Sequence, residues 1–356
     1  MDFPVNSTSK AKFFHPYQNY PKLESPNCFL ATLSCFISNN YKVNDLDLAH
    51  LEHEFHLFNN DNFDISGIHS NMSIQPGWDM SSTESVLSHR VVKNIRSRYG
   101  FKVNRLKVTN FQELDKILLS KDYHLMSVVD PFFIEESPYF NKDHAFSVCI
   151  INGKDSSNCT YSFIERKHQQ SHISFEGFKN NFNYFLESYG YLDIYVVDRE
   201  DTGFHIDHIS LVDDLSRIIS NLKSSSSRLG LNAIQNFTAQ YKNLLKNDTP
   251  FLVPWTERCF GERHANALFF RALLNEQHYL ANYFIEDIEK IIKCYEELAD
   301  LWRAFEMFHH FSVSQNSVKT LYRNIPILEE ICTKESLVAK KMDDFQQQIE
   351  NLTTNK

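Results

Sequence analysis

One stretch of the chain decides the fold, and it reads Ser25-Pro26-Asn27-Cys28-Phe29-Leu30-Ala31-Thr32-Leu33. Ser25 can act as a helix N-cap, and Pro26 suits the first helical position, where its missing N–H costs nothing. Apolar residues follow at helical spacing and form one face, made by Phe29, Leu30, Leu33, Phe36 and Ile37. The stretch therefore predicts a helix that ends near Asn40 and carries Cys28 in its first turn.

Apolar runs further along the chain predict strands. They cover residues 125–129, 144–151, 161–164 and 191–197, and the second run begins with His144. The polar residues 152–155 separate the second and third runs and predict the turn of a hairpin. Two more helices are expected at 46–58 and 82–99, so that helices cover a central antiparallel sheet.

Beyond residue 201 the strand signals stop. Ser224 to Ser227 form a polar linker, and helical patterns cover 229–245, 262–275, 279–308 and 317–349. We therefore expect an α+β catalytic domain at 1–200, followed by an all-helical domain at 201–356. Length and aromatic content of the helix at 279–308 also favour a homodimer.

Composition narrows the class of protein. The chain has 356 residues, is 42% hydrophobic and carries a net charge of −9, which argues against a nucleic-acid-binding face. No apolar run is long enough to span a membrane and the first residues do not resemble a signal peptide, so we expect a soluble, cytoplasmic protein. The seven cysteines are scattered, which favours reduced thiols.

Cys28 and His144 are the candidate catalytic pair. A thiol acts as a nucleophile in its thiolate form, which a helix N-terminus and a neighbouring imidazolium both stabilise. His144 would take the thiol proton and later return one to a leaving group. The alternative for Cys28 is a small buried apolar residue, and its pairing with a histidine at the start of a core strand favours catalysis.

A carboxylate should orient the imidazole of His144. The predicted hairpin returns its second strand to the start of the first, which places Glu165 at the same end of the sheet as His144. We therefore rank Glu165 first, Asp155 in the expected turn second and Asp130 third. A surface ion pair is the alternative role for Glu165.

Other constellations are weaker. Gln18 and Asn27 could supply an oxyanion donor, although neither has the expected spacing, and that position stays open. Histidines at helical spacing, His50, His53 and His56, and the pair His168 and His172 lack further ligands, so we expect no metal. With only nine glycines there is no Gly-rich phosphate loop, so we expect no nucleotide cofactor.

One basic segment stands out in this acidic chain. From Arg90 to Lys107 there are seven Arg and Lys residues with no Asp or Glu between them. Such a segment could dock an acidic partner or a phosphate group, and the alternative is a solvated helix face.

The order of a cysteine on an early helix and a histidine on a later strand is typical of papain-like cysteine sites. The stretches 27–32, 128–133, 143–148 and 163–165 resemble the N-terminal domain of the butirosin biosynthesis protein H family, and 262–274 is similar to its helical C-terminal domain. This family has a papain-like, C39-peptidase-like fold. The chain departs from the family at Glu165-Arg166, where Asp-Pro is usual.

The resemblance implies an acyltransferase or amide synthase of antibiotic biosynthesis. Such an enzyme takes an acyl group from the phosphopantetheine thioester of a carrier protein onto a cysteine, here Cys28, and passes it to an amine, with His144 as the base. Carrier proteins are acidic, so the basic segment from Arg90 to Lys107 becomes a candidate docking face. The alternatives are a cysteine peptidase or amidase that uses water, and an inactive papain-like scaffold that only binds a partner.

Overall fold

The structure is a computed structural model, and it describes most of the chain. The described residues are 12–14, 28–41, 95–96, 100–119, 125–142, 144, 147–155, 157–164, 170–200, 208–226, 230–247, 251, 253, 257–275 and 279–354. They fall into two compact units, of which the first reaches Glu200 and the second starts at His208.

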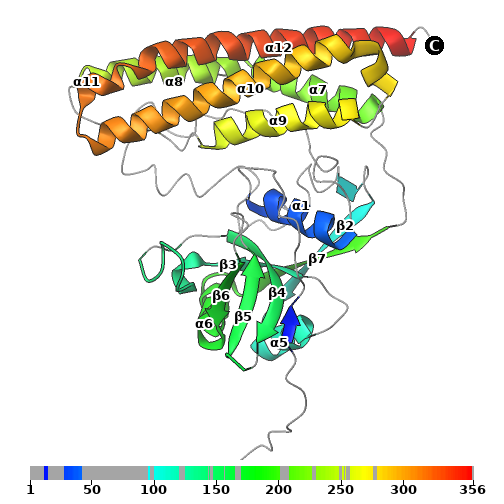
Figure 1. Cartoon of the computed structure of the whole chain (residues 1–356), viewed down its shortest axis with the longest axis vertical. Helices are drawn as coiled ribbons and strands as arrows, with labels where there is room; N and C mark the ends of the chain where they lie inside the picture. The colour runs from blue at the N-terminus through cyan, green and yellow to red at the C-terminus, as the bar shows by residue number, and fades with distance from the viewer. Residues whose placement is uncertain are drawn as a thin grey trace, which may run out of the picture. The chain divides into compact units, whose positions relative to one another are not determined.

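The first unit is built on one antiparallel sheet (Figure 1). Its strands lie in the order β2 (Phe101–Val108), β7 (Leu192–Arg199), β3 (Leu125–Val129), β4 (Ser147–Asp155), β5 (Thr160–Ile164) and β6 (Gln170–Ser174). A short β1 (Lys12–Phe14) pairs with the second half of β4. The expected α+β class with an antiparallel sheet is therefore confirmed, and all four predicted strands are present.

Helix α1 (Cys28–Tyr41) packs on this sheet. Its predicted apolar face is buried, because Phe29, Leu33, Phe36 and Ile37 are each at most 1% exposed. Phe29 meets Tyr195 of β7 edge to face, and Thr32 Oγ1 donates a hydrogen bond to Val148 O of β4 at 2.9 Å. The helical periodicity of the sequence thus located this helix correctly to within a turn.

Three further elements belong to this unit, and Ile95 and Arg96, within the helix expected at 82–99, are also helical. Helix α5 (Phe111–Leu119) follows β2, and the short 3₁₀ helix η2 (Pro131–Phe133) follows β3. Helix α6 (Phe175–Tyr189) begins after Ser174, whose side chain accepts a hydrogen bond from Gly177 N, and ends at Gly190 with φ of 81°. The N-cap and the left-handed C-cap fix the length of α6.

The predicted turn of the hairpin at 152–155 is wrong. These residues belong to β4, which runs on to Asp155, and Asp155 pairs with Thr160 at the start of β5. The Asp155 carboxylate stabilises the later turn because Oδ1 accepts hydrogen bonds from Ser157 N at 2.9 Å and Asn158 N at 3.2 Å. Ile164 consequently lies opposite Ile150, three residues after Ser147 at the start of β4.

Every regular element described after residue 207 is a helix. These are α7 (His208–Leu222), α8 (Gly230–Leu245), α9 (Glu257–Asn275), α10 (Tyr279–Ser314), α11 (Val318–Leu321) and α12 (Asn324–Thr354). They share one apolar core, in which aromatic side chains such as Phe237, Phe270 and Trp302 are almost fully buried. The helices expected from sequence periodicity after the serine linker are therefore present, with α10 six residues longer than predicted.

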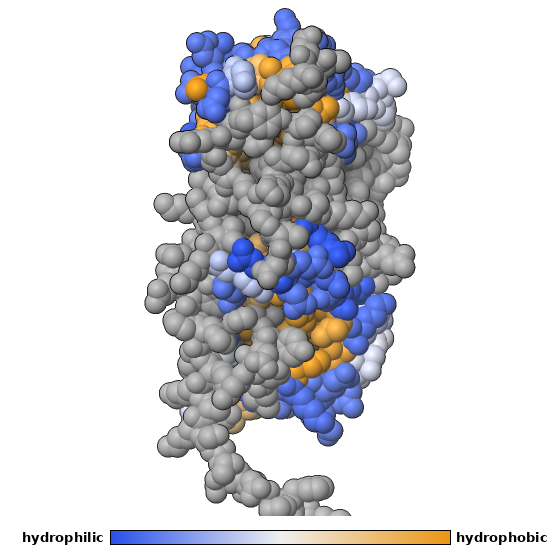
Figure 2. Space-filling view, turned by 90° about the vertical axis from the view of Figure 1, so that its right-hand side faces the viewer, coloured by the Kyte–Doolittle hydropathy of each residue, from blue (hydrophilic) through white to orange (hydrophobic). Residues whose placement is uncertain are grey.

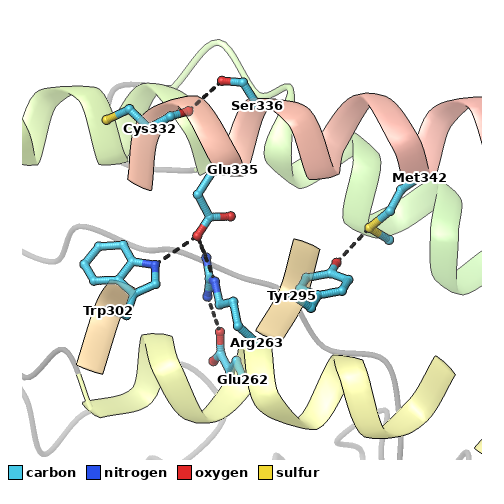
Figure 3. A network of polar contacts seen from close by, with 8 residues as sticks. All are labelled: Glu262, Arg263, Tyr295, Trp302, Cys332, Glu335, Ser336 and Met342. Carbon is cyan, nitrogen blue, oxygen red and sulfur yellow. Dashed lines mark hydrogen bonds and ion pairs between the residues drawn. The ribbon is translucent and has the colours of Figure 1, made fainter. Parts of the chain in front are cut away.

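A charged network lies inside this core (Figure 3). Arg263 of α9 contacts Glu335 of α12 at 2.8 Å and Glu262 at 3.1 Å, and all three side chains are at most 1% exposed. Trp302 of α10 donates its indole N–H to Glu335 at 3.0 Å. The network therefore ties α9, α10 and α12 together through one buried guanidinium.

Several large apolar side chains of α10 are exposed. They lie near its two ends and are Tyr283, Ile285, Met307, Phe308 and Phe311. Hydrophobic residues also reach the surface on the face drawn in Figure 2. Among the described helices, none combines the length and the apolar character that crossing a bilayer requires.

Candidate active site

His144 and Asp130 form the centre of the candidate site. Asp130 follows directly after β3, and His144 lies three residues before β4. Because β3 and β4 are antiparallel neighbours, with Val129 opposite Ser147, the end of one strand meets the start of the other. His144 Nδ1 lies 2.6 Å from Asp130 Oδ2.

Asp130 is held on three sides. Its carboxylate is fully buried, and Oδ1 accepts a hydrogen bond from Phe132 N at 2.9 Å as the N-cap of η2. Its own backbone N–H donates to Asn181 Oδ1 of α6 at 2.8 Å. These contacts leave Oδ2 directed at the imidazole, so that Nδ1 carries the proton and Nε2 is the free basic nitrogen.

The imidazole of His144 is stacked between two aromatic rings. The ring centroid of Phe132 lies 4.2 Å from that of His144 at an interplanar angle of 21°, and the ring centroid of Tyr184 lies 4.5 Å from it at an interplanar angle of 2°. A five-membered ring has no room for both on one face, so they cover its two faces. The His144 side chain is nevertheless 44% exposed.

Tyr184 itself does not serve as a base at neutral pH. Burial first, and then the charge of Asp130, raise the pKa of its hydroxyl. Its role toward His144 is therefore one of ring contact rather than proton transfer.

Cys28 is the first residue of α1, and the direction of this helix decides toward which end of the sheet its N-terminus lies. Thr32, one turn after Cys28, contacts Val148 near the start of β4, whereas Tyr41 OH at the other end donates to Val197 O of β7. Register places Val196 of β7 and Ile151 of β4 opposite the same residue of β3, so Val197 lies level with the second half of β4. Helix α1 therefore runs in the same direction as β4, and its N-terminus faces the end of the sheet that carries His144.

The acid beside His144 is thus Asp130, the third of the three carboxylates ranked from the sequence. Glu165 lies outside the described residues. Asp155 is used by its own turn through Ser157 and Asn158. A simple signal was available for Asp130: consecutive antiparallel strands bring the residue after the first next to the residue before the second.

Two aromatic residues and one amide were missed entirely. Phe132, Tyr184 and Asn181 contact the pair directly, yet nothing in their local sequence distinguishes them from core residues. Gln18 and Asn27, considered for the oxyanion position, lie outside the described residues, as do His50, His53, His56 and His168.

The basic segment is partly neutralised by Asp193 of β7 and by Glu200, which follows β7. Arg105 forms a two-point ion pair with Asp193 at 2.6–2.7 Å, in which both side chains are nearly buried. Arg96 pairs with Glu200 at 3.1 Å. Residues 101–107 of this segment lie in β2 beside β7, whereas Arg96 is helical and exposed.

No family model matches the chain, and no curated protein matches it either.

Proposed function

We propose that the chain is a cysteine-dependent acyltransferase or amide synthase, with Cys28 as nucleophile, His144 as base and Asp130 as the orienting acid. The observation that supports it most is the buried carboxylate 2.6 Å from His144 Nδ1, at the end of the sheet toward which the N-terminus of α1 is directed. A scaffold that only bound a partner would have no need of a buried, oriented acid beside an accessible imidazole.

The proposed reaction has two steps. His144 Nε2 takes the proton of Cys28, and the thiolate sulfur bonds to the acyl carbon of a thioester, while the departing phosphopantetheine thiol receives that proton. An amine then attacks the acyl–Cys28 carbonyl carbon and gives its proton to His144. The amide is released, and Cys28 leaves as the thiolate.

One feature favours transfer over hydrolysis. The resemblance to the butirosin biosynthesis protein H family, with its papain-like fold and helical C-terminal domain, implies transfer to an amine. The absence of a Gly-rich phosphate loop from the sequence argues instead against a nucleotide-dependent ligase, so that the energy for an amide bond would arrive in a preformed thioester.

The proposed acyl donor is carried by an acidic carrier protein. With Arg96 and Arg105 engaged by Glu200 and Asp193, the described basic side chains left to meet it are the exposed Lys102 and Lys107 on β2. Lys107 lies over the ring of Tyr191 at 4.4 Å, which holds its ammonium group at the surface. We propose docking at this edge strand.

A homodimer remains part of the proposal. The exposed apolar side chains at the two ends of α10 are those that a second copy would cover. Sedimentation velocity of the wild-type chain and of a Met307→Asp, Phe311→Asp double variant would measure this directly.

Intact-protein mass spectrometry tests the reaction. The chain is mixed with acyl-loaded carrier protein, and we expect a covalent adduct of the acyl mass that an added amine discharges as an amide. Cys28→Ala should abolish the adduct, and Cys159→Ala, which changes an exposed cysteine in the turn before β5, should leave it intact.

The outcomes separate the hypotheses. An adduct that water discharges as fast as any amine would replace transfer by hydrolysis. No adduct with any thioester, together with an unreactive Cys28 thiol, would refute enzymatic function at this site.

A further inference from the structure

Asn181 and Tyr184 of α6 contact the acid–imidazole pair, and Gly177 faces Phe133 O of η2 beside it. Gly177, Asn181 and Tyr184 stand at positions i, i+4 and i+7, so they lie on one stripe of the helix. We call this stripe the α6 face. It lies against η2, whose first residues follow Asp130.

Gly177 sets the distance between α6 and η2. A Cβ added at this position would come 3.3 Å from Phe133 O and 3.0 Å from both Ile173 Cγ1 and Ser174 Oγ. These separations are tighter than ordinary van der Waals contact, so a methyl group here would push the helix away from the backbone of η2. The glycine allows a close approach that a larger residue would prevent.

Asn181 then fixes the backbone of Asp130. Its side chain is fully buried, and its Oδ1 accepts from Asp130 N at 2.8 Å. A buried N–H without this acceptor would be costly, so the contact holds the peptide from which the carboxylate projects.

Tyr184 fixes the plane of His144. With its ring parallel to the imidazole at 4.5 Å, and Phe132 on the other face, rotation of the imidazole about its Cβ–Cγ bond would require the aromatic rings to move apart. Because the imidazole is planar, fixing its plane fixes both the direction of Nδ1 toward Asp130 and the direction of Nε2.

We propose that the α6 face is the positioning surface of the site, with Tyr184 as its principal positioning residue: it orients His144 so that Nε2 is aligned for proton transfer with Cys28. The inference rests on the proposed function in that this proton transfer drives catalysis. It adds that the geometry depends on a helix that contributes no reacting atom.

The first test measures alkylation of Cys28 by iodoacetamide, located by peptide mass spectrometry. Tyr184→Leu should slow it by roughly 10- to 100-fold because a misplaced base loses the near-attack geometry. Tyr184→Phe keeps the stacked ring and should retain the wild-type rate. In acyl transfer the same loss should appear in kcat, with KM unchanged.

The second test is independent of any activity. The Cε1–H resonance of His144, assigned by its disappearance in His144→Gln, should move downfield in Tyr184→Leu, because one of two shielding ring currents is lost, and stay in place in Tyr184→Phe. Phe132→Leu removes the other ring and serves if Tyr184→Leu does not fold. Gly177→Ala should slow alkylation, and Asn183→Ala, on the exposed side of α6, should not.

Each outcome of these experiments either supports or overturns the positioning role of the α6 face. An unchanged His144 resonance and an unchanged alkylation rate in Tyr184→Leu would overturn the inference, as would equal slowing in Tyr184→Leu and Tyr184→Phe. If wild type and His144→Ala are alkylated at the same rate, the proposed catalytic pair fails, and the His144 resonance alone then decides whether the α6 face holds the imidazole.

Discussion

Replacing Asp130 by Asn is the sharpest test of the site, because the contacts of this side chain fix which way the new amide must point. Oδ1 of Asp130 accepts a hydrogen bond from Phe132 N at 2.9 Å, and an amide NH₂ cannot take that place. The amide oxygen therefore stays against Phe132, and the NH₂ group faces Nδ1 of His144.

This orientation reverses the tautomer of His144. Nδ1 must accept from the amide, so the proton moves to Nε2, which can then no longer take the proton of Cys28. Loss of a hydrogen bond to a charged group is worth about 1.5–3 kcal/mol. That loss alone corresponds to about 10- to 150-fold in rate. With the wrong tautomer added, we expect Asp130→Asn to slow the reaction on the order of 10²- to 10⁴-fold.

The assay is the rate of Cys28 alkylation by iodoacetamide, followed by single-turnover acylation from a thioester. Asp155→Asn is the matched control because Asp155 is also buried in this unit but stabilises its own turn. It should lower the free energy of unfolding by about 1–3 kcal/mol while leaving the alkylation rate unchanged. A wild-type alkylation rate in Asp130→Asn, with the fold intact, would refute the assignment of Asp130.

Three further predictions concern stability. Burial lowers the pKa of His309 from 6.5 to about 4, so the unfolded chain binds the proton first as the pH falls. The free energy of unfolding should therefore fall by up to about 3 kcal/mol between pH 6.5 and 4. His309→Gln should remove most of the pH dependence that His309 adds to the free energy of unfolding in urea titrations, and an unaltered pH dependence would contradict this prediction. Arg263→Met removes the guanidinium that two buried carboxylates contact and should cost about 3–5 kcal/mol, against less than about 1 kcal/mol for the exposed Arg271→Met. Equal costs would contradict the network. Gly230→Ala should destabilise the protein more than Gly190→Ala. At Gly230 φ is 63° and an added Cβ would lie 2.2 Å from a carbonyl oxygen, whereas at Gly190 only the φ of 81° opposes a side chain, at a cost of about 1 kcal/mol. Equal melting temperatures of the two variants would contradict this prediction.

The elements that follow from local pattern were predictable. Helix α1 with Cys28 at its start, the strands at 125–129 and 161–164, and the long helices after residue 229 all follow from apolar periodicity and from N-cap or proline preferences, which act over a few residues. These features depend on residues that are neighbours along the chain, so they can be predicted from the sequence.

The orienting acid depended on register, which is not local. A hairpin turn placed at 152–155 returns residue 165 to the start of the strand, whereas the observed turn after Asp155 brings Ile164 only as far as Ile150. A shift of a few residues in a turn moves every residue of the next strand by the same amount, so the hairpin that ranked Glu165 first was wrong, and Glu165 itself lies outside the described residues. The ion pairs of the basic segment were not predictable for a related reason, since Asp193 on β7 lies 88 residues along the chain from Arg105.

The sequence by itself therefore determined that Cys28 lies at the start of a helix, that His144 precedes a core strand, and that helices dominate the second half of the chain. The tertiary structure decided which carboxylate faces that histidine, which aromatic rings hold its plane and which arginines are engaged. The physical reason is that capping and amphipathic periodicity are satisfied within a few residues, whereas strand pairing, ring stacking and ion pairing depend on which distant segments pack together.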